Sequence, residues 1–406
     1  MSIASRSPAA SSPIAPGSDA LRDLLARIAS GAAVREREGR PPYDIVDLIR
    51  ETRFGAMRIP VEEGGAGASY REFFATLIDL AHADANVAHI LRAHFWFVEL
   101  RLLATDRAER GRWLGEVARG AIFGNAASEL GPRTVGGREL DTRLTSDGDG
   151  FRLNGTKYYC TGSLFSDWVA VFAATDDGRM ASVIVPVDRD GLTLEDDWDG
   201  IGQRLTGTGT ARLAGVAVAA DEVIVLRGGD EWPASYVGAF LQLYLTAVLA
   251  GVARSIVDDA AALTRGRART YAHAAAPTAT ADPQLQQVIG EIASQAFAAE
   301  SLVLIAAEAL DAAAASVVDG VPDAAFAAEA SLRAAKAKVV VDQLTPRIAT
   351  QLFDVGGASA IKQAHNLDRH WRNARTLASH NPTVYKARAI GDWLVNGTAL
   401  PANGFF

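Results

Sequence analysis

Cysteine is almost absent from this 406-residue chain, which contains a single thiol, Cys160. One cysteine cannot form an internal disulfide, and it cannot supply a cysteine-rich zinc or iron–sulfur site. The absence of disulfides fits a reducing compartment, so we expect a cytoplasmic protein. His82, His89, His365 and His370 show no metal-ligand spacing with nearby carboxylates, and we expect no metal site.

An excess of positive charge is also absent. The chain has 40 Lys and Arg against 48 Asp and Glu, a net charge of −8, which is not the electrostatic footprint of a nucleic-acid-binding protein. The sequence contains no Gly-x-Gly-x-x-Gly that opens a helix after a strand, no P-loop, no His-Glu-x-x-His and no Gly-x-Ser-x-Gly. The common short motifs therefore do not reveal its chemistry.

A secretion signal is missing as well. The first seventeen residues are rich in Ser, Ala and Pro without an apolar segment, so residues 1–17 are expected to form a disordered tail. The uncharged run Tyr236–Ala253 has eighteen residues but contains Gln242 and Thr246, and Ala-rich helical segments follow it. It is predicted to be the core helix of a bundle rather than a membrane span.

Three stretches of different periodicity follow the tail. Residues 18–119 have helical spacing, and Ser18 is expected to cap the first helix. Residues 120–228 alternate with period two, and the segment SDGDGFRLNGTKYYCTG carries Asp-Gly and Asn-Gly pairs that predict turns between short strands. Residues 229–406 become Ala-rich and helical again. We therefore expect a helical domain, a β domain and a helix bundle.

Several segments, in this order, resemble the acyl-CoA dehydrogenase superfamily. They are FGAMRIPVEEGGAGASYREF, FGNAASE, LNGTKYYCTGSLFSDW and WDGIGQRLTGTGTARLAGVAV. The resemblance covers nearly the whole chain after the tail. It implies an α+β fold with an N-terminal α-helical domain, a central β-barrel domain and a C-terminal four-helix bundle.

The C-terminal segment indicates the branch of that superfamily. LFDVGGASAIKQAHNLDRHWRNARTLASHNPTVYKARAIGDWLVNG resembles the reduced-flavin monooxygenases of the dibenzothiophene monooxygenase type and the sulfur-acquisition oxidoreductases related to them. A dehydrogenase of this fold typically has a catalytic Glu here, but Thr376–Pro382 contains no carboxylate. Without a base, removal of a substrate α-proton has no acceptor at this place. Glu99 and Glu231 stay open as displaced bases.

This resemblance implies that reduced FMN and O2 form a C4a-hydroperoxyflavin, and it assigns catalytic roles to three residues. His380 would donate to the peroxide, Thr161 would contact flavin N5, O4 or the peroxide, and the Asn125 amide would reach the flavin or the peroxide. A helix-capping His380, an ordinary strand Thr161 and a turn Asn125 are the structural alternatives.

The resemblance also implies the remaining flavin contacts. Ser128 and Tyr159 would lie beside the ring system, and Arg269 matches an arginine that typically reaches the phosphate from a neighbouring subunit. The same phosphate would be approached by the loop that contains Gly356, Gly357, Ser359 and Lys362, where the dibenzothiophene enzymes tend to have an arginine. FAD stays open as an alternative cofactor.

Seven residues are candidates for the lining of the substrate pocket. They are His94, Trp96, Val98, Trp198, Phe240, Tyr244 and Leu377. The resemblance points to His94, Val98 and Leu377, and the other four are aromatic side chains suited to a pocket wall. The dibenzothiophene enzymes have an aromatic hydroxyl where this chain has Val98 and a second histidine where it has Leu377. Both differences make the pocket more apolar and favour a different, smaller or aliphatic, substrate. Plain core packing is the alternative for His94 and for each aromatic residue.

We therefore expect the oxygenase component of a two-component flavin system, which oxygenates a small organosulfur compound. A separate NAD(P)H-dependent reductase would supply FMNH2, because nothing in the sequence resembles a nicotinamide site. Apolar surface on the C-terminal helices predicts a homo-oligomer, a tetramer built as a dimer of dimers. N-oxygenation, FAD-dependent acyl-CoA dehydrogenation and a non-enzymatic flavin-binding scaffold are the competing hypotheses.

Overall fold

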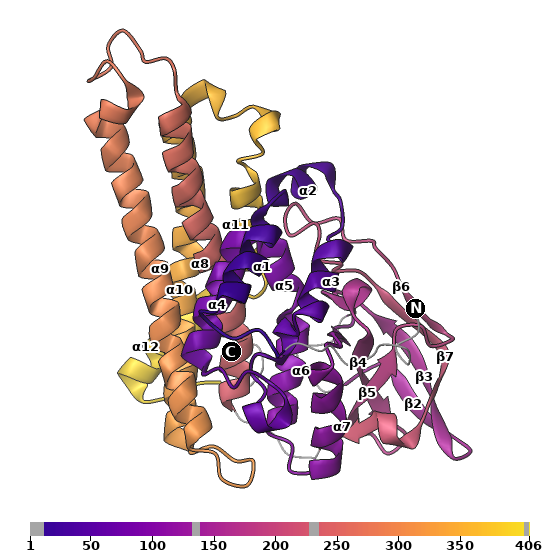
Figure 1. The fold of residues 1–406 in the computed structure, drawn as a ribbon. Helices are drawn as coiled ribbons and strands as arrows, with labels where there is room; N and C mark the ends of the chain where they lie inside the picture. The colour runs from indigo at the N-terminus through magenta and orange to yellow at the C-terminus, as the bar shows by residue number, and fades with distance from the viewer. Residues whose placement is uncertain (1–11, 132–138, 227–234, 402–405) are drawn as a thin grey trace.

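A computed structural model describes residues 12–131, 139–226, 235–401 and 406. Short helices form the first part of the chain, strands the middle, and long helices the last part (Figure 1). In Figure 1 the long C-terminal helices stand on one side, the sheet lies on the other, and the N-terminal helices lie between them. The predicted order of a helical, a β and a second helical domain is confirmed.

The N-terminal helices are α1 (Asp19–Ala29), α2 (Ala32–Glu38), α3 (Tyr43–Glu51), α4 (Tyr70–Ala83), α5 (Ala85–Ile90), α6 (Arg92–Leu102) and α7 (Arg107–Ala118). Ser18 caps α1, as its position predicts, because its hydroxyl accepts the Leu21 N–H. Residues 12–17, expected to belong to a frayed tail, are instead packed on the domain. Ile14 is buried and its N–H donates to Thr52 O, so apolar burial orders this segment.

The strands are β1 (Phe123–Ala126), β2 (Arg143–Asp147), β3 (Gly150–Lys157), β4 (Trp168–Thr175), β5 (Met180–Pro186), β6 (Leu192–Leu194), β7 (Ala211–Val218) and β8 (Val223–Val225). Their order is β6-β7-β3-β2-β4-β5-β8, with β1 parallel to β4. The predicted barrel is wrong, because in the described residues the sheet stays open. The edge strands β6 and β8 have three residues each, which is too few to close the sheet.

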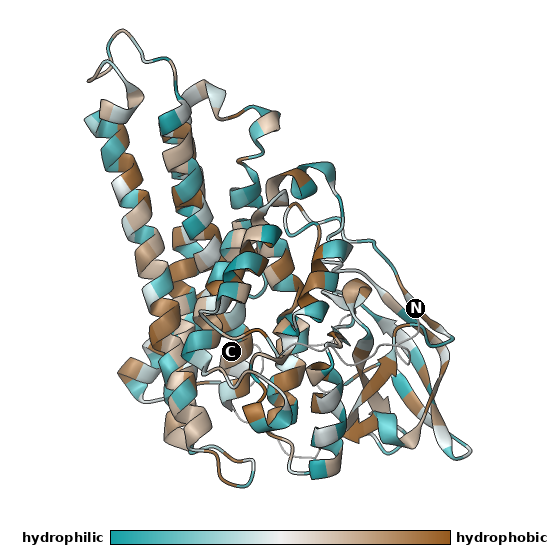
Figure 2. Cartoon of the chain, in the orientation of Figure 1, coloured by the Kyte–Doolittle hydropathy of each residue, from teal (hydrophilic) through white to brown (hydrophobic). Residues whose placement is uncertain are grey.

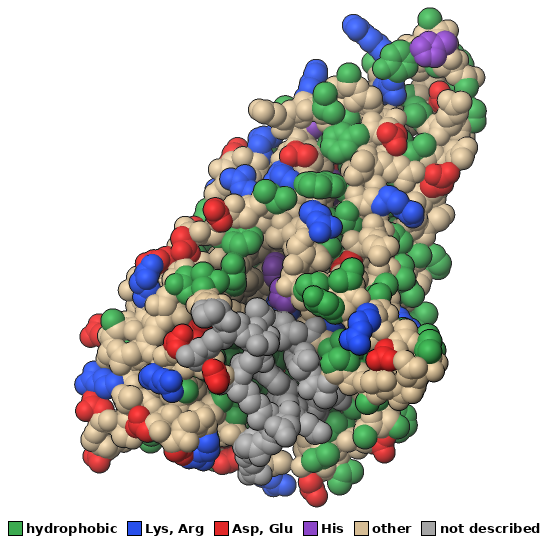
Figure 3. All heavy atoms as spheres, turned by 180° about the vertical axis from the view of Figure 1, so that it is seen from behind, with side chains coloured by type: hydrophobic (Ala, Val, Ile, Leu, Met, Phe, Trp, Pro, Cys, Tyr) green, Lys and Arg blue, Asp and Glu red, His purple; other side chains and the backbone are tan. Residues whose placement is uncertain are grey.

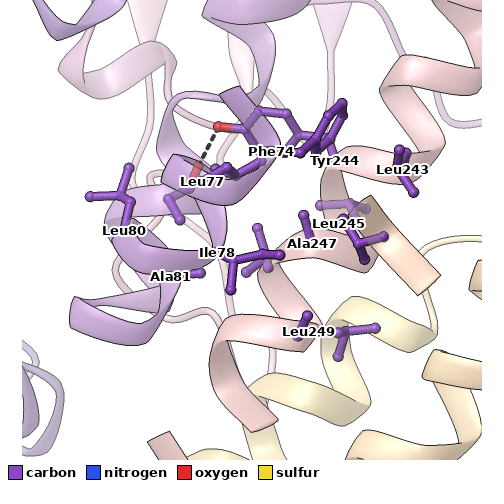
Figure 4. Packing of buried hydrophobic residues seen from close by; sticks show 14 of the residues in the cluster. Phe74, Leu77, Ile78, Leu80, Ala81, Leu243, Tyr244, Leu245, Ala247 and Leu249 are labelled. Carbon is purple, nitrogen blue, oxygen red and sulfur yellow. Dashed lines mark hydrogen bonds between the residues drawn. The ribbon is translucent and has the colours of Figure 1, made fainter. Parts of the chain in front are cut away.

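The C-terminal domain contains α8 (Ser235–Gly266), α9 (Pro283–Ala315), α10 (Ala324–Gly356), α11 (Arg369–Ala378) and α12 (Thr383–Asn396). The expected four-helix bundle therefore consists of three long helices and two short ones. The predicted core helix is the first part of α8. Its leucines and Tyr244 pack against Phe74, Leu77 and Ile78 of α4 (Figure 4). This packing joins the first and last domains.

Two helices are long and apolar enough to cross a membrane by length and composition. In α8 the apolar window is 89% buried inside the protein, as a core helix requires, whereas in α9 it is 22% buried. Helix α9 lies on the outside of the bundle, and Figure 2 shows apolar residues along it. Phe297 and Ile305 on this helix are exposed, so α9 presents an apolar face that this chain alone does not cover.

Candidate functional site

The turn after β3 and the strand β1 lie together at one edge of the sheet domain. The Ser163 hydroxyl donates to Asn125 O over 3.0 Å, and Tyr158 N–H donates to Ser128 O over 2.9 Å. A side chain at Gly124 would meet Ser163 Oγ at 2.6 Å, so glycine is needed there. The structure thus brings together Asn125, Ser128 and the segment that contains Thr161.

Thr161 belongs to a chain of three hydroxyl groups. Its Oγ1 lies 2.9 Å from Thr208 Oγ1, which lies 2.7 Å from Thr206 Oγ1, and Thr206 donates to Gln203 O over 2.8 Å. Each hydroxyl has one proton. Since the proton of Thr206 goes to a carbonyl, Thr208 must donate to Thr206, and Thr161 must donate to Thr208. The half-buried Thr161 therefore has only acceptor lone pairs left for a ligand.

Gln203 connects this hydroxyl chain to the helical domains. Its Oε1 lies 3.0 Å from His89 Nδ1 of α5, and its backbone N–H donates to Asn373 Oδ1 of α11 over 2.7 Å. The Gln203 Nε2 donor is buried and has no acceptor in the described part of the chain. Burial and the charge of Arg92 lower the pKa of His89 to about 3, so this imidazole is neutral.

His380 follows α11 and lies near His89. Its side chain is solvent-exposed, yet enough protein surrounds it that desolvation lowers its pKa well below 6.5, and Arg92 and Lys338 add to this shift. Exposure together with desolvation is typical of the wall of a recess. Figure 3 shows the face of the molecule opposite to that of Figure 1, where histidine side chains are set back in a hollow of the surface. A neutral His380 can donate or accept one proton there.

The expected pocket residue His94 is held by the backbone on both sides. Its Nε2 lies 3.0 Å from Gly55 O, and its Nδ1 accepts the Phe123 N–H over 3.1 Å. This pairing fixes the Nε2–H tautomer, and burial lowers the pKa of His94 to about 4. These contacts favour a role in joining α6 to β1, and they leave no ring nitrogen for a substrate.

Most other expected pocket residues lie in the packed interior. The buried ones are Trp96, Val98, Phe240, Tyr244 and Leu377. The Tyr244 hydroxyl donates to Ala88 O over 2.8 Å, and Trp96 packs 5.6 Å from the Phe172 ring. Trp198 differs, because it is half-buried and lies perpendicular to Tyr159 with 6.2 Å between the ring centres. Of these residues, Trp198 is the one with surface left for a ligand.

The expected phosphate contacts lie at the opposite end of the bundle. Arg269, Ser359 and Lys362 are exposed, and Gly357 ends α10 with φ of 56°. Gly356 lies beside Leu263 of α8. Asn381, next to His380, donates its Nδ2–H to Gln242 Oε1 of α8 over 2.9 Å. Gln242 and Leu263 are 21 residues apart in α8, which corresponds to about 31 Å along the helix axis. One FMN cannot reach both groups within a single chain.

Glu99 and Glu231 are the two candidates for the catalytic base of a dehydrogenase, and the structure describes only the first. Glu99 is buried, binds Arg58 over 2.8 Å and accepts the Tyr70 hydroxyl, so both of its oxygens are occupied. Glu231 lies outside the described residues. Among those that are described, no group of three or more His, Cys, Asp and Glu side chains could hold a metal ion.

The residues around Thr161 fit a flavin. An isoalloxazine needs an aromatic or apolar surface and hydrogen-bonding groups at its edge. Tyr159 is 54% exposed with φ of 57°, an unusual backbone conformation that presents its ring beside Trp198. Asn125 and Thr161 are half-buried, and Gln203 has its unpaired buried donor. Sequence reasoning missed Gln203, His89 and Arg92, because their importance lies in contacts between domains.

Comparison with known proteins identifies the family of this chain. Residues 18–121 match the N-terminal domain of acyl-CoA dehydrogenases, 134–216 their middle domain and 243–385 their C-terminal domain. The chain belongs to the acyl-CoA dehydrogenase family. This acyl-CoA dehydrogenase-like chain is 29% identical to the probable FMNH2-dependent monooxygenase SfnC of Pseudomonas putida over 391 residues, 95% of this chain and 96% of the relative.

Related structures and a nitrogen-oxidising relative match over similar lengths. FMN-bound TdsC from Paenibacillus sp. A11-2 is 28% identical with a TM-score of 0.87, covering 96% of this chain and 99% of TdsC. Methanesulfinate monooxygenase MsuC from Pseudomonas fluorescens is 27% identical with a TM-score of 0.86, covering 95% and 98%. L-evernosamine nitrososynthase of Micromonospora is 28% identical over 401 residues, 92% of this chain and 89% of the relative.

Proposed function

We propose that this protein is the oxygenase component of a two-component flavin monooxygenase that uses reduced FMN and O2 to oxygenate a small organosulfur compound. The hydroxyl chain that ends at Thr161 is the observation that carries the proposal. It presents an acceptor to a flavin, which matches the N5–H that only the reduced ring has. The relationship to an FMNH2-dependent enzyme and to FMN-bound TdsC supports the same cofactor.

Bound FMN would supply the activation of O2, and the chain's own residues would supply position and protons. Thr161 would accept from the flavin edge, the Asn125 amide and Gln203 Nε2 would donate, and Tyr159 with Trp198 would cover the ring. His380, neutral at physiological pH, can hold one proton at the recess wall and deliver it to oxygen.

A second copy of the chain would complete the cofactor site. The catalytic and phosphate groups of one chain lie too far apart for one FMN, and α9 leaves an apolar face uncovered. An isologous pair that covers α9 would bring Arg269 and the 356–362 loop of one copy to Thr161 of the other. This supports the proposal of a homo-oligomer, with a tetramer as the expected form. A separate NAD(P)H-dependent reductase is the proposed source of reduced FMN.

Two alternatives share this fold. N-oxygenation is supported by the nitrososynthase relative, and it would require an amine substrate in place of a sulfur compound. FAD-dependent dehydrogenation of an acyl-CoA would require a free carboxylate at the flavin. The one described candidate, Glu99, is bound to Arg58 and Tyr70, which disfavours that reading.

The test is an oxygen-transfer assay with photoreduced FMN, air and a small thioether. We expect sulfoxide that contains ¹⁸O from ¹⁸O2, formed by FMN and not by FAD. In His380→Ala we expect at least about tenfold less sulfoxide for each reduced flavin consumed, with hydrogen peroxide in its place. Oxidation of an amine only would favour the nitrogen alternative. Bleaching of bound FAD by an acyl-CoA would overturn the proposal.

A further inference from the structure

Arg92, the first residue of α6, is a cation without a carboxylate partner among the residues that the structure describes. Its Nε and Nη2 donate weakly to one acceptor, Leu241 O, over 3.4 and 3.3 Å. No described residue supplies an acceptor for Nη1, and no described Asp or Glu forms an ion pair with this guanidinium. Arginine has five N–H donors, so most of its hydrogen-bonding capacity is unused.

Other arginines of the same domain show that this is unusual. Arg35 binds Asp84 over 2.9 Å, Arg58 binds Glu99 over 2.8 Å, and Arg101 binds Glu109. Arg92 is half-buried, and an unpaired charge that is partly withdrawn from water costs free energy, because it loses hydration without gaining a counter-ion. Burial lowers the pKa of Arg92 to about 10, so it is still a cation at neutral pH. A fold retains such a group most readily where a ligand supplies the negative charge.

Contacts with two helices place Arg92 close to His89 and His380. Arg92 follows His89 by three residues where α5 meets α6, and its acceptor Leu241 precedes Gln242, which binds Asn381 next to His380. The Arg92 charge lowers the pKa values of His89 and His380. Lys338 also acts on His380, but Lys338 is paired with Asp342 over 2.7 Å. Arg92 is therefore the uncompensated positive charge at this site.

We propose that Arg92 binds an anionic group of the substrate, so that the recess beside His380 takes a small organic anion whose oxidisable sulfur lies within or next to that group. This inference rests on the proposed function and names its substrate class. An alkanesulfinate fits both requirements. Its sulfur lone pair forms the new S–O bond, one atom of O2 enters the sulfonate and the other becomes water, and two electrons and two protons come from reduced FMN.

Equilibrium binding to the flavin-free protein tests the inference without any turnover. Methanesulfinate and dimethyl sulfoxide form a matched pair, because they have similar shape and only the first is charged. By calorimetry we expect the protein to bind methanesulfinate and not dimethyl sulfoxide. Arg92→Met should weaken methanesulfinate binding at least about tenfold, since charge-assisted hydrogen bonds are lost, and Arg92→Lys should restore part of it.

Controls separate a ligand role from a structural one. Arg27→Met removes an exposed arginine of α1 and should bind methanesulfinate like the unmodified protein. Arg92→Met should melt at the same or a higher temperature than the unmodified protein, because it removes an unpaired charge. A lower melting temperature with unchanged binding would assign Arg92 to the Leu241 contact and overturn the inference. Weaker FMN binding with unchanged methanesulfinate binding would assign Arg92 to the cofactor and also overturn it.

The two proposals fail in different ways. If thioether and methanesulfinate are both oxygenated and Arg92→Met does not change their ratio, the substrate class is wrong and the monooxygenase stands. If methanesulfinate binds in an Arg92-dependent manner but no substrate is oxygenated, the proposed function is wrong and the anion site stands.

Discussion

The direction of the Thr161 hydroxyl proton would distinguish the two oxidation states of a flavin whose N5 lies at Thr161, as proposed above. Because Thr206 donates to Gln203 O, the chain through Thr208 leaves Thr161 as an acceptor. An acceptor matches the N5–H of reduced flavin and opposes the bare N5 of oxidised flavin. With Thr161 at flavin N5, as proposed above, this acceptor would be a local physical reason for a preference for reduced FMN, which the residue types alone do not reveal.

Thr208→Val should weaken that preference. Valine has nearly the same shape but cannot accept the Thr161 proton, which then becomes free to point to the ligand. We expect the ratio of the dissociation constants for oxidised and reduced FMN to fall about two- to tenfold, the value of one hydrogen bond. Fluorescence titration with oxidised FMN and anaerobic titration with reduced FMN measure the two constants.

An exposed threonine serves as the control for this substitution. Thr193→Val in β6 makes the same chemical change away from the site and should leave the ratio unchanged. A ratio that rises in Thr208→Val, or one that stays at the unmodified value, would contradict the deduced proton direction.

At the scale of elements, the turn after β3 depends on a close approach to the N-terminal helices. Gly162 has φ of 82°, and a side chain there would meet Ile90 O at 2.3 Å. Gly162→Ala should therefore both strain the backbone and push the Thr161 turn away from α5. We expect a loss of stability of about 2 kcal/mol or more in urea unfolding, together with weaker FMN binding.

Gly178 provides a matched comparison for that prediction. It has nearly the same φ, 80°, but a side chain there meets nothing within 4 Å. Gly178→Ala should show the backbone cost of about 1 kcal/mol alone, with FMN affinity unchanged. Equal effects of the two substitutions would mean that the contact with Ile90 is unimportant.

The sequence predicts individual elements better than it predicts how they join. The Asp-Gly pair at 147–148 forms the expected turn between β2 and β3, because the two strands pair as far as Asp147 and Gly150. The Asn154-Gly155 pair does not form a turn. It lies inside β3, where the register with β7 shifts between Leu153 and Gly155. A glycine with φ of 153° serves a bulge as well as a turn, and local sequence cannot separate the two.

For the candidate site too, the sequence predicts single residues better than it predicts which residues meet. Thr161, Asn125 and His380 are found through motifs that resemble a known family, and the structure places Thr161 and Asn125 at the same edge of the sheet. His89, Gln203 and Arg92 come from α5, the loop before β7 and α6, and they meet only after folding. His94 has the residue type of a ligand, but its backbone partners are visible only in three dimensions.

At the scale of the whole molecule, buried neutral histidines make stability depend on pH. Burial lowers the pKa of His89 to about 3 and the pKa values of His94 and His370 to about 4. The unfolded chain protonates these groups near pH 6.5, so below that value it binds protons that the native state does not. The free energy of unfolding should fall as pH decreases from 6.5 to 4, by about 1.4 kcal/mol per pH unit for each histidine.

Urea unfolding followed by circular dichroism at pH 7.5, 6 and 5 measures this slope. His94→Gln removes one of the three groups, so its slope below pH 6.5 should be smaller by about the contribution of one histidine. Its stability at pH 7.5 should also be lower, because the contacts with Gly55 and Phe123 are altered. A flat profile between pH 6.5 and 5 would contradict the assignment of these histidines as buried and neutral.

The separation of the proposed catalytic and phosphate-binding residues predicts that activity requires two chains. Arg269→Ala and His380→Ala should each form at least about tenfold less sulfoxide alone. In a mixed dimer, one site has His380 from the first chain and Arg269 from the second, and both of these are intact. When an equal mixture of the two variants is unfolded and refolded, about half of the dimers contain one chain of each kind. Each of these mixed dimers has one intact site out of two, so about a quarter of the unmodified activity should return. If both residues served one chain's own site, mixing would restore nothing, because each chain would keep its own defect.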